Sequence, residues 1–276
     1  MFLKKIKLKV LGLFILLPVQ LTGALGDLEP NMPYLIHLDA TYSFANIPRI
    51  QGAVNPVNYR TNENKLTLSS WMSTMSYLEF GALFEFNQTV KLPFNLESGG
   101  FYLKKAFLDD LSGDLFSFDG GLLVQFVPTN RLRDPITPYN DVANFSLFGE
   151  IFKNFVFDRS NLCFTPYLAA DFGIANRGYP WLDPAVGGRL SYDRLSFDLS
   201  ILGTFGFGNL TVINVNAFRG YAMTAYRAID IELFLGYSFA EEGFLSVGYF
   251  GRLFARAFPQ DRQGFFIQLD LPLPVF

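Results

Sequence analysis

The sequence predicts an all-β protein, a transmembrane antiparallel up-and-down β-barrel of about 12 strands, within a range of 10–14. Apolar and polar residues alternate with a period of two in many windows, as in strands with one apolar and one polar face. Half of the 276 residues are apolar, including 32 Phe and 13 Tyr. No apolar run after the first 21 residues is long enough for a membrane-spanning helix. A membrane barrel accommodates this composition because lipid covers its apolar face.

The first 26 residues have the order of a secretory signal peptide. An apolar run at 10–21 is followed by small residues, and it is preceded by Lys4, Lys5, Lys7 and Lys9. Cleavage is expected after Ala24 or Gly26. A retained anchor is the alternative, but about a dozen apolar residues fall short of the ~20 that a spanning helix needs. Cleavage moves the formal charge from −3 to −7, so the remaining barrel domain, 27–276, is acidic and nucleic acid is not an expected partner.

The alternation can be followed along the chain. Residues 34–44, 78–86 and 116–126 place apolar side chains at even positions, and 162–174, 195–205, 229–239 and 245–255 repeat a period of two. The windows 65–76 and 101–108 are less regular. Twelve strands are therefore expected near 33–44, 65–76, 78–94, 100–108, 115–127, 143–155, 162–175, 184–192, 195–206, 224–239, 244–256 and 263–275.

Long and short connections alternate between most of these strands. The short connections are 109–114, 156–161, 193–194 and 240–243, and the long ones are 46–64, 128–142, 176–183, 206–223 and 257–262. An even strand number with short periplasmic turns and long outer loops is typical of outer-membrane barrels. We therefore expect the protein in the outer membrane of a Gram-negative cell, with both termini in the periplasm.

The last segment, GFFIQLDLPLPVF at 264–276, has one wholly apolar face and ends on Phe276. It resembles the closing strand of bacterial outer-membrane barrels, and that resemblance implies that the barrel-assembly machinery reads Phe276. Pro272 and Pro274 lack the N–H groups that a strand ladder uses. Regular pairing is therefore expected to weaken after about Leu271.

If the apolar faces meet lipid, the polar faces line the interior. The residues expected there are mostly acidic, and Lys104 or Lys105 is expected beside them: Asp39, Glu79, Glu85, Asp119, Glu150, Asp171, Arg189, Asp198, Asp230, Glu232, Arg252, Arg256 and Asp270. An excess of carboxylates in a wet lumen favours cations over anions. The alternative is that these charges pair with one another and fill a narrow barrel.

Two long loops carry arginine and aromatic or amide side chains. Loop 128–142 holds Arg131, Arg133 and Tyr139, and loop 46–64 holds Arg49 and Arg60. Such side chains suit contact with lipopolysaccharide phosphates or a constriction at the mouth of the barrel. The alternative is that they are ordinary solvated loop residues.

Catalysis is not expected, and neither is a cofactor or a metal. His37 is the only histidine and Cys163 the only cysteine, so His-rich and Cys-based metal sites and an intrachain disulfide are excluded. His37 and Asp39 share one strand face, as a general base and its orienting partner would in an outer-membrane hydrolase. No nucleophile can be named beside them, and no Gly-x-Ser-x-Gly motif is present.

The segment 103–125, LKKAFLDDLSGDLFSFDGGLLVQ, pairs a short acidic turn with an alternating strand. It resembles outer-membrane transporters of the phenol meta-pathway type, and the broader barrel resemblance covers nearly all of the mature sequence. These resemblances imply a porin-like channel or transporter that passes small solutes. One alternative is a closed structural or surface-interaction barrel that acts through loops 46–64, 128–142 and 206–223. The non-membrane alternative is a secreted soluble β-protein.

Overall fold

A computed structural model describes residues 35–74, 77–157, 161–239 and 243–274. The expected signal peptide and Phe276 lie outside these residues. The strands are β1 Leu35–Ile47, β2 Arg49–Ile50, β3 Ala53–Val54, β4 Thr61–Ser73, β5 Leu78–Gln88, β6 Asn95–Leu108, β7 Ser117–Phe126, β8 Ala143–Phe152, β9 Phe155–Phe157, β10 Leu162–Ala175, β11 Trp181–Tyr192, β12 Leu195–Gly206, β13 Ile213–Asn214, β14 Arg227–Ser238, β15 Phe244–Arg256, β16 Pro259–Gln260 and β17 Gln263–Pro274. Two short 3₁₀ helices, η1 Arg131–Arg133 and η2 Val215–Ala217, lie between strands.

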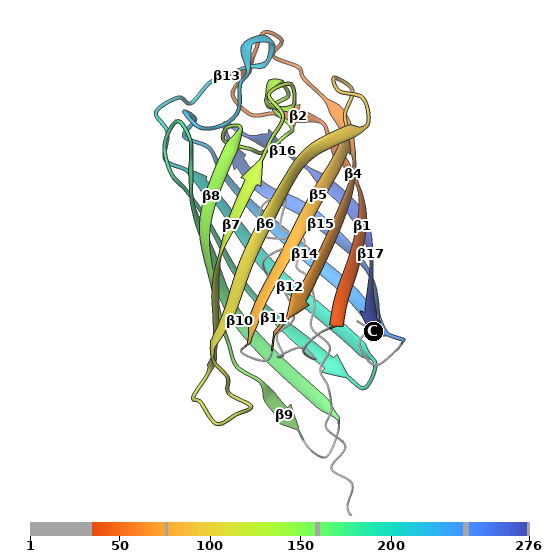
Figure 1. Cartoon of the computed structure of the whole chain (residues 1–276). Coiled ribbons are helices and arrows are strands. Elements are labelled where there is room, and N and C mark those ends of the chain that lie inside the picture. Colours follow the sequence, from red (N-terminus) through yellow and green to blue (C-terminus); the bar gives the residue numbers. More distant parts are fainter. Residues whose placement is uncertain (1–34, 75–76, 158–160, 240–242, 275–276) are drawn as a thin grey trace, which may run out of the picture.

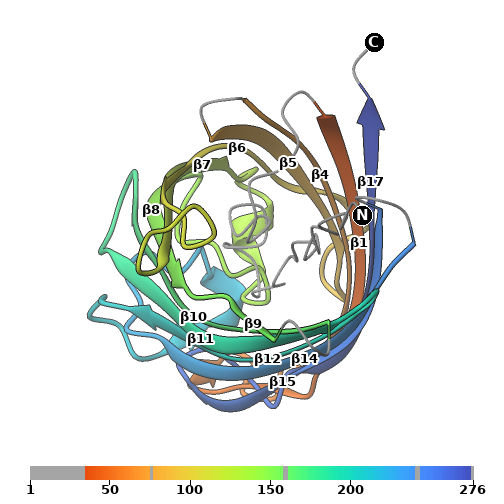
Figure 2. The same ribbon diagram turned by 90° about the horizontal axis from the view of Figure 1, so that it is seen from below.

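Twelve long strands close into one antiparallel barrel, as the sequence predicts (Figure 2). The first and last strands pair from Leu35 opposite Pro274 to Asn46 opposite Gln263. The pairing of β10 with β11 completes the ring. The short strand β9 pairs with the first residues of β10 as an addition to the ring. Closure gives each of the twelve long strands a neighbour on both sides, which a membrane demands because lipid offers no hydrogen-bond partners.

The two faces of the wall differ in the way that the alternation predicts. Large apolar side chains are exposed on the outside, among them Phe80, Phe84, Phe101, Leu122, Phe145, Leu147, Leu168, Phe172, Val186, Leu199, Ile201 and Ile267. Polar and charged side chains from the same strands are buried inside. An apolar outer surface around a polar interior is that of a membrane-spanning barrel. No helix in the described part of the chain is long and apolar enough to cross a membrane.

Three irregularities change the alternation, one in β15 and two in β6, of which the one at Phe107 lies where Ala106 pairs with Asp119 and Leu108 with Phe118. The one in β15 overturns a sequence prediction. Between β14 and β15, Ile229 lies opposite Phe254 and Asp230 opposite Arg252, so Leu253 is an extra residue. Side chains after the bulge exchange faces. Arg252 is therefore buried, whereas Arg256, which was predicted to line the interior, is exposed on the outside. The other irregularity in β6 is a bulge, where Glu85 of β5 pairs with Ser98 and Phe86 with Leu96.

The predicted weakening of the last strand occurs on one side only. Pairing of β15 with β17 ends where Phe244 lies opposite Asp270. Pairing of β1 with β17 continues past Leu271, so on that side the prediction is wrong. The two proline residues lack N–H groups but keep their carbonyl oxygens, and they are tolerated where the strand has a neighbour on one side only.

The long connections gather at one end of the barrel, the upper end in Figure 1. There β2 pairs with β16 and β3 pairs with β13, which links loop 48–60 to loops 257–262 and 207–226. The short connections, the start of β1 and the end of β17 lie at the other end. Strand bounds differ most from prediction at β5, which ends at Gln88 rather than 94, and at β6, which begins at Asn95 rather than 100.

Candidate functional site

The barrel interior contains almost all of the residues predicted to line it. Twelve of the thirteen are buried, and the exception is Arg256: the buried ones are Asp39, Glu79, Glu85, Asp119, Glu150, Asp171, Arg189, Asp198, Asp230, Glu232, Arg252 and Asp270. Lys104 is buried too, while Lys105 is exposed. Their strands place them on one continuous inner wall because every second side chain of a strand faces the same way.

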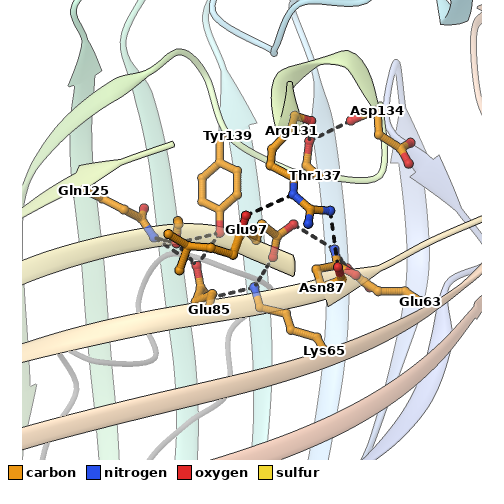
Figure 3. A network of polar contacts seen from close by, with 12 residues as sticks. Glu63, Lys65, Glu85, Asn87, Glu97, Gln125, Arg131, Asp134, Thr137 and Tyr139 are labelled. Atoms are coloured by element: carbon orange, nitrogen blue, oxygen red, sulfur yellow. Dashed lines mark hydrogen bonds and ion pairs between the residues drawn. The ribbon is translucent and has the colours of Figure 1, made fainter. Parts of the chain in front are cut away.

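A buried ion-pair cluster lies on β4, β5 and β6 (Figure 3). The Lys65 Nζ atom lies 2.6 Å from Glu85 Oε1 and 3.4 Å from Glu97 Oε2. Asn87 Nδ2 donates to Glu97 Oε1 at 2.8 Å and to Glu63 Oε1 at 3.1 Å. Lys65 therefore balances the carboxylates of Glu85 and Glu97 on two neighbouring strands. The amide of Asn87 links a third carboxylate, that of Glu63, to the cluster.

Glu85 is the centre of this cluster. Its Oε2 atom accepts hydrogen bonds from Ser98 Oγ at 2.5 Å and Gln125 Nε2 at 3.0 Å. The Tyr139 hydroxyl donates a third hydrogen bond to the same oxygen. Burial, followed by the charges of Glu85 and Glu97, raises the pKa of Tyr139 well above its usual 10. The phenol is therefore a neutral donor, and it holds the loop between β7 and β8 against the inner wall.

Arg131 holds the same loop at a second point. Its guanidinium donates to three backbone carbonyl oxygens of β5, β6 and the turn between them: Asn87 at 3.2 Å, Leu96 at 3.0 Å and Pro93 at 3.0 Å. The side chain is 2% exposed. Together with Tyr139 it brings residues 127–142 inside the ring of strands, where Figure 2 shows this green segment. The loop therefore narrows the barrel at this level.

Asp134 holds loop 127–142 at a third point, against the loops that contain Tyr59 and Thr89. Its carboxylate accepts hydrogen bonds from Thr89 Oγ1 at 2.5 Å, Tyr59 Oη at 3.1 Å and the Ile136 N–H at 3.1 Å. Burial raises the pKa of Asp134, and these three donors partly oppose that rise. The loops 48–60, 89–94 and 127–142 are thus joined at one carboxylate.

Apolar residues of four loops and the adjoining strand ends form a cap at the same end of the barrel. The cap is the buried cluster Ile47, Ile50, Ala53, Ile136, Trp181, Ile213, Val215, Phe218, Tyr221, Tyr226, Ala228, Ala255, Ala257 and Phe258. Tyr221 N–H donates to the Tyr139 carbonyl at 3.0 Å, and Ala222 N–H donates to the Asn140 carbonyl at 3.1 Å. The narrowing loop and loop 207–226 therefore form one packed unit.

Other interior charges are also paired across strands. Lys104 lies 3.0 Å from Glu79 and 3.8 Å from Asp119. The shortest nitrogen–oxygen distances in three further pairs are 3.5 Å for Arg189 with Asp198, 2.6 Å for Arg252 with Asp230 and 2.9 Å for Arg262 with Glu63. The interior is thus a set of local networks of opposite charge, in which acids outnumber bases.

His37 does not have the carboxylate partner that the sequence suggested. Its Nδ1 atom lies 3.1 Å from Asp270 Oδ1, and its ring stacks on Trp71 with 3.8 Å between centroids. Asp39 instead accepts hydrogen bonds from Gln268 at 2.8 Å and Thr41 at 3.3 Å. Strand pairing of β1 with β17 places Asp270 opposite Asp39, which sequence spacing alone cannot show.

Sequence reasoning missed three charged residues of the cluster: Glu63, Lys65 and Glu97. Glu63 lies before the predicted start of its strand, although the odd residues from Thr61 to Ser69 are all polar and could have extended it. Lys65 lies at the start of the window 65–76, where the alternation is less regular. Glu97 lies at the bulge in β6. No strict period of two can locate a bulge from one sequence.

No family model and no curated protein sequence matches this chain. Among solved structures, an outer-membrane channel from Pseudomonas putida F1 aligns over 89% of this chain and 97% of that chain, with 11% identity and a TM-score of 0.64. The NanC porin covers 86% of this chain and 100% of that chain, with 12% identity and a TM-score of 0.48. At such identities a likeness shows the fold alone. This chain thus has the barrel fold of an outer-membrane channel.

Proposed function

We propose that the protein is an outer-membrane channel that passes small solutes and favours cations. The observation that carries this proposal is the charge of the interior. In the described ranges, fifteen Asp or Glu side chains and six Lys or Arg side chains are buried. An acidic path raises the local concentration of cations and repels anions. The fold shared with an outer-membrane channel supports the same function.

Cation preference is tested by the reversal potential of the folded protein in a planar bilayer. Under a KCl gradient, we expect discrete conductance steps and a reversal potential of the sign that K⁺ permeation sets. A reversal potential of the opposite sign would contradict the acidic path. Absence of steps both from the heat-modifiable, folded wild-type protein and from a variant whose loop 127–142 is released from the inner wall would contradict the channel itself.

The second candidate is a closed barrel that acts through its outer loops, and the cap favours it. The cap joins loops 48–60, 127–142, 207–226 and 257–262 into one packed apolar unit. An apolar constriction can also gate a channel by excluding water. The cap is therefore compatible with a gated channel as well as with a closed barrel. Release of loop 127–142 from the inner wall by the substitution Arg131→Ala separates the two candidates.

We also propose that the short-connection end faces the periplasm, which places both termini there and the cap outside. In this orientation the outward Arg227 and Arg256 lie at the outer end of the wall. They are cross-strand neighbours on β14 and β15, and both are exposed. Paired guanidinium groups suit phosphate, so lipopolysaccharide is the proposed lipid partner. The barrel-assembly machinery stays the predicted reader of Phe276.

Replacing both arginines with glutamine is expected to abolish stabilisation by lipopolysaccharide. The wild-type barrel should unfold at a higher temperature with lipopolysaccharide than with phosphatidylcholine alone, because its phosphates bridge the two guanidinium groups. The R227Q/R256Q barrel should show no difference between the two lipids on semi-native gels. R194Q is the matched control, since Arg194 is exposed at the opposite end of the barrel. Equal stabilisation of all three proteins would contradict the proposed contact.

A further inference from the structure

Two aspartates face each other across β10 and β11 on the inner wall. Asp171 lies opposite Asp183 in the strand register. Asp171 is 1% exposed and Asp183 is 6% exposed. Side chains directly opposite each other in an antiparallel pair approach within about 4.5–5.5 Å at their Cβ atoms, and like charges in that position repel. The arrangement therefore requires a counter-charge, a hydrogen-bond donor or a proton at the two carboxyl groups.

The protein itself supplies little of that compensation. Both carboxylate oxygens of Asp171 and the Oδ1 atom of Asp183 are buried without a hydrogen-bond partner. The Ser146 hydroxyl lies beside Asp171 without forming a well-directed hydrogen bond, and the Phe205 N–H lies at Asp183. Leaving a buried charge without a partner costs several kcal/mol. Three adjacent acceptor atoms thus lack a hydrogen-bond donor in the described part of the chain.

A second cross-strand aspartate pair shows the difference. Asp39 lies opposite Asp270 on β1 and β17. Gln268 and Thr41 donate to Asp39, and His37 lies at Asp270. The protein therefore supplies donors to this pair on both carboxylates. Because the Asp39–Asp270 pair has partners within the protein, a cross-strand aspartate pair does not by itself leave oxygens unsatisfied. The unsatisfied oxygens of Asp171 and Asp183 are therefore specific to β10 and β11.

Aromatic rings lie next to the unpartnered pair. Trp181 is two residues from Asp183 on the same face, and its indole extends across the wall over Gly173 of β10. A Cβ atom on Gly173 would lie 2.0 Å from Cζ2 of Trp181, so only glycine leaves room for the ring. Tyr226 is fully buried in the same cap cluster. Burial, with the nearby charge of Asp183 second, raises the pKa of Tyr226 well above 10.

We infer that Asp171, Asp183 and Trp181 form a binding site for an organic cation, a primary ammonium or guanidinium group. Such a group offers several N–H donors to the carboxylates, and its charge is attracted to the face of an aromatic ring. A bare metal ion fits less well. Calcium takes six to eight oxygen ligands, and no cluster of three His, Cys, Asp or Glu in the described part of the chain is arranged to hold a metal. The inference rests on the proposed channel, because it places the site on the path beneath the cap.

The site can be tested by fluorescence, because the chain has two tryptophans, Trp71 and Trp181. In a W71F background, Trp181 alone reports. Titration of the folded, detergent-solubilised barrel with propylammonium chloride is expected to give a saturable change in Trp181 emission. Sodium chloride and 1-propanol at equal concentrations should not reproduce it. A response equal to that of sodium chloride would overturn the inference, since it would reflect ionic strength alone.

Charge-neutral variants locate the site. D171N/D183N is expected to raise the apparent dissociation constant for propylammonium at least tenfold, which is a loss of about 1.4 kcal/mol. D39N/D270N is the matched control, because it removes the same charge from the other cross-strand pair, and its binding should be unchanged. Equal loss in both variants would overturn the specific site. In bilayers, conductance without saturable binding would leave the channel and refute the site. Binding without conductance, in wild type and in a variant with loop 127–142 released, would leave the site and refute the channel.

Discussion

Replacing Arg131 with alanine is expected to increase single-channel conductance severalfold. Arg131 is the side chain that ties the inward loop 127–142 to the carbonyl oxygens of Asn87, Leu96 and Pro93. Without it, the loop keeps its contacts through Tyr139 and Asp134 but loses three charge-assisted hydrogen bonds, each worth roughly 1.5–3 kcal/mol. The loop then leaves the inner wall for part of the time, and the path widens.

The measurement is the conductance of single R131A barrels in a planar bilayer, compared with wild type and R133A. Arg133 is the matched control because it lies in the same 3₁₀ turn but its side chain is exposed. We expect R133A to behave as wild type. Silence in wild type with steps in R131A would identify a channel that the loop closes. Silence in all three proteins would support the closed barrel, and equal steps in all three would show that the loop does not limit passage.

Replacing Lys65 with methionine is expected to destabilise the barrel by about 3–5 kcal/mol, which is typical for removal of one partner from a buried ion pair. Lys65 is the cation at both Glu85 and Glu97, whereas Arg262 pairs with Glu63. Its loss removes the cation that pairs with both carboxylates and leaves them held by hydrogen bonds. Urea unfolding in lipid vesicles, followed by the heat-modifiable gel shift, measures the difference.

Two further variants keep this prediction specific. K105M removes a lysine charge from the outside of the wall, where Lys105 is exposed. It should change the free energy of unfolding by less than about 1 kcal/mol. K65M/E97Q removes the lysine and one carboxylate together, so it should recover part of the lost stability. If K65M were as stable as K105M, the cluster would not be a source of barrel stability.

The loops show where sequence reasoning stops. From the sequence, Arg131 and Tyr139 suit contacts with lipopolysaccharide, a constriction or a solvated loop, and nothing in the spacing of the loop distinguishes these. The structure places both inside the barrel, on Leu96, Pro93 and Glu85. Such contacts link residues tens of positions apart, and they depend on which strands become neighbours when the ring closes. The alternation along a single strand carries no information about which distant residues the closed ring brings into contact.

The wall itself was determined by the sequence, for a simple physical reason. A strand places successive side chains on opposite faces, so alternation of apolar and polar residues decides which face meets lipid and which meets the interior. Twelve strands and the inward position of Asp39, Glu85, Asp171 and Glu232 follow from that period. Only the tertiary structure decided where bulges interrupt this alternation and which side chains of neighbouring strands meet. The bulge at Leu253 turned Arg256 outward, the bulge in β6 brought Glu97 to Lys65, and ring closure paired Asp39 with Asp270. These depend on the register between strands, which a single strand does not contain.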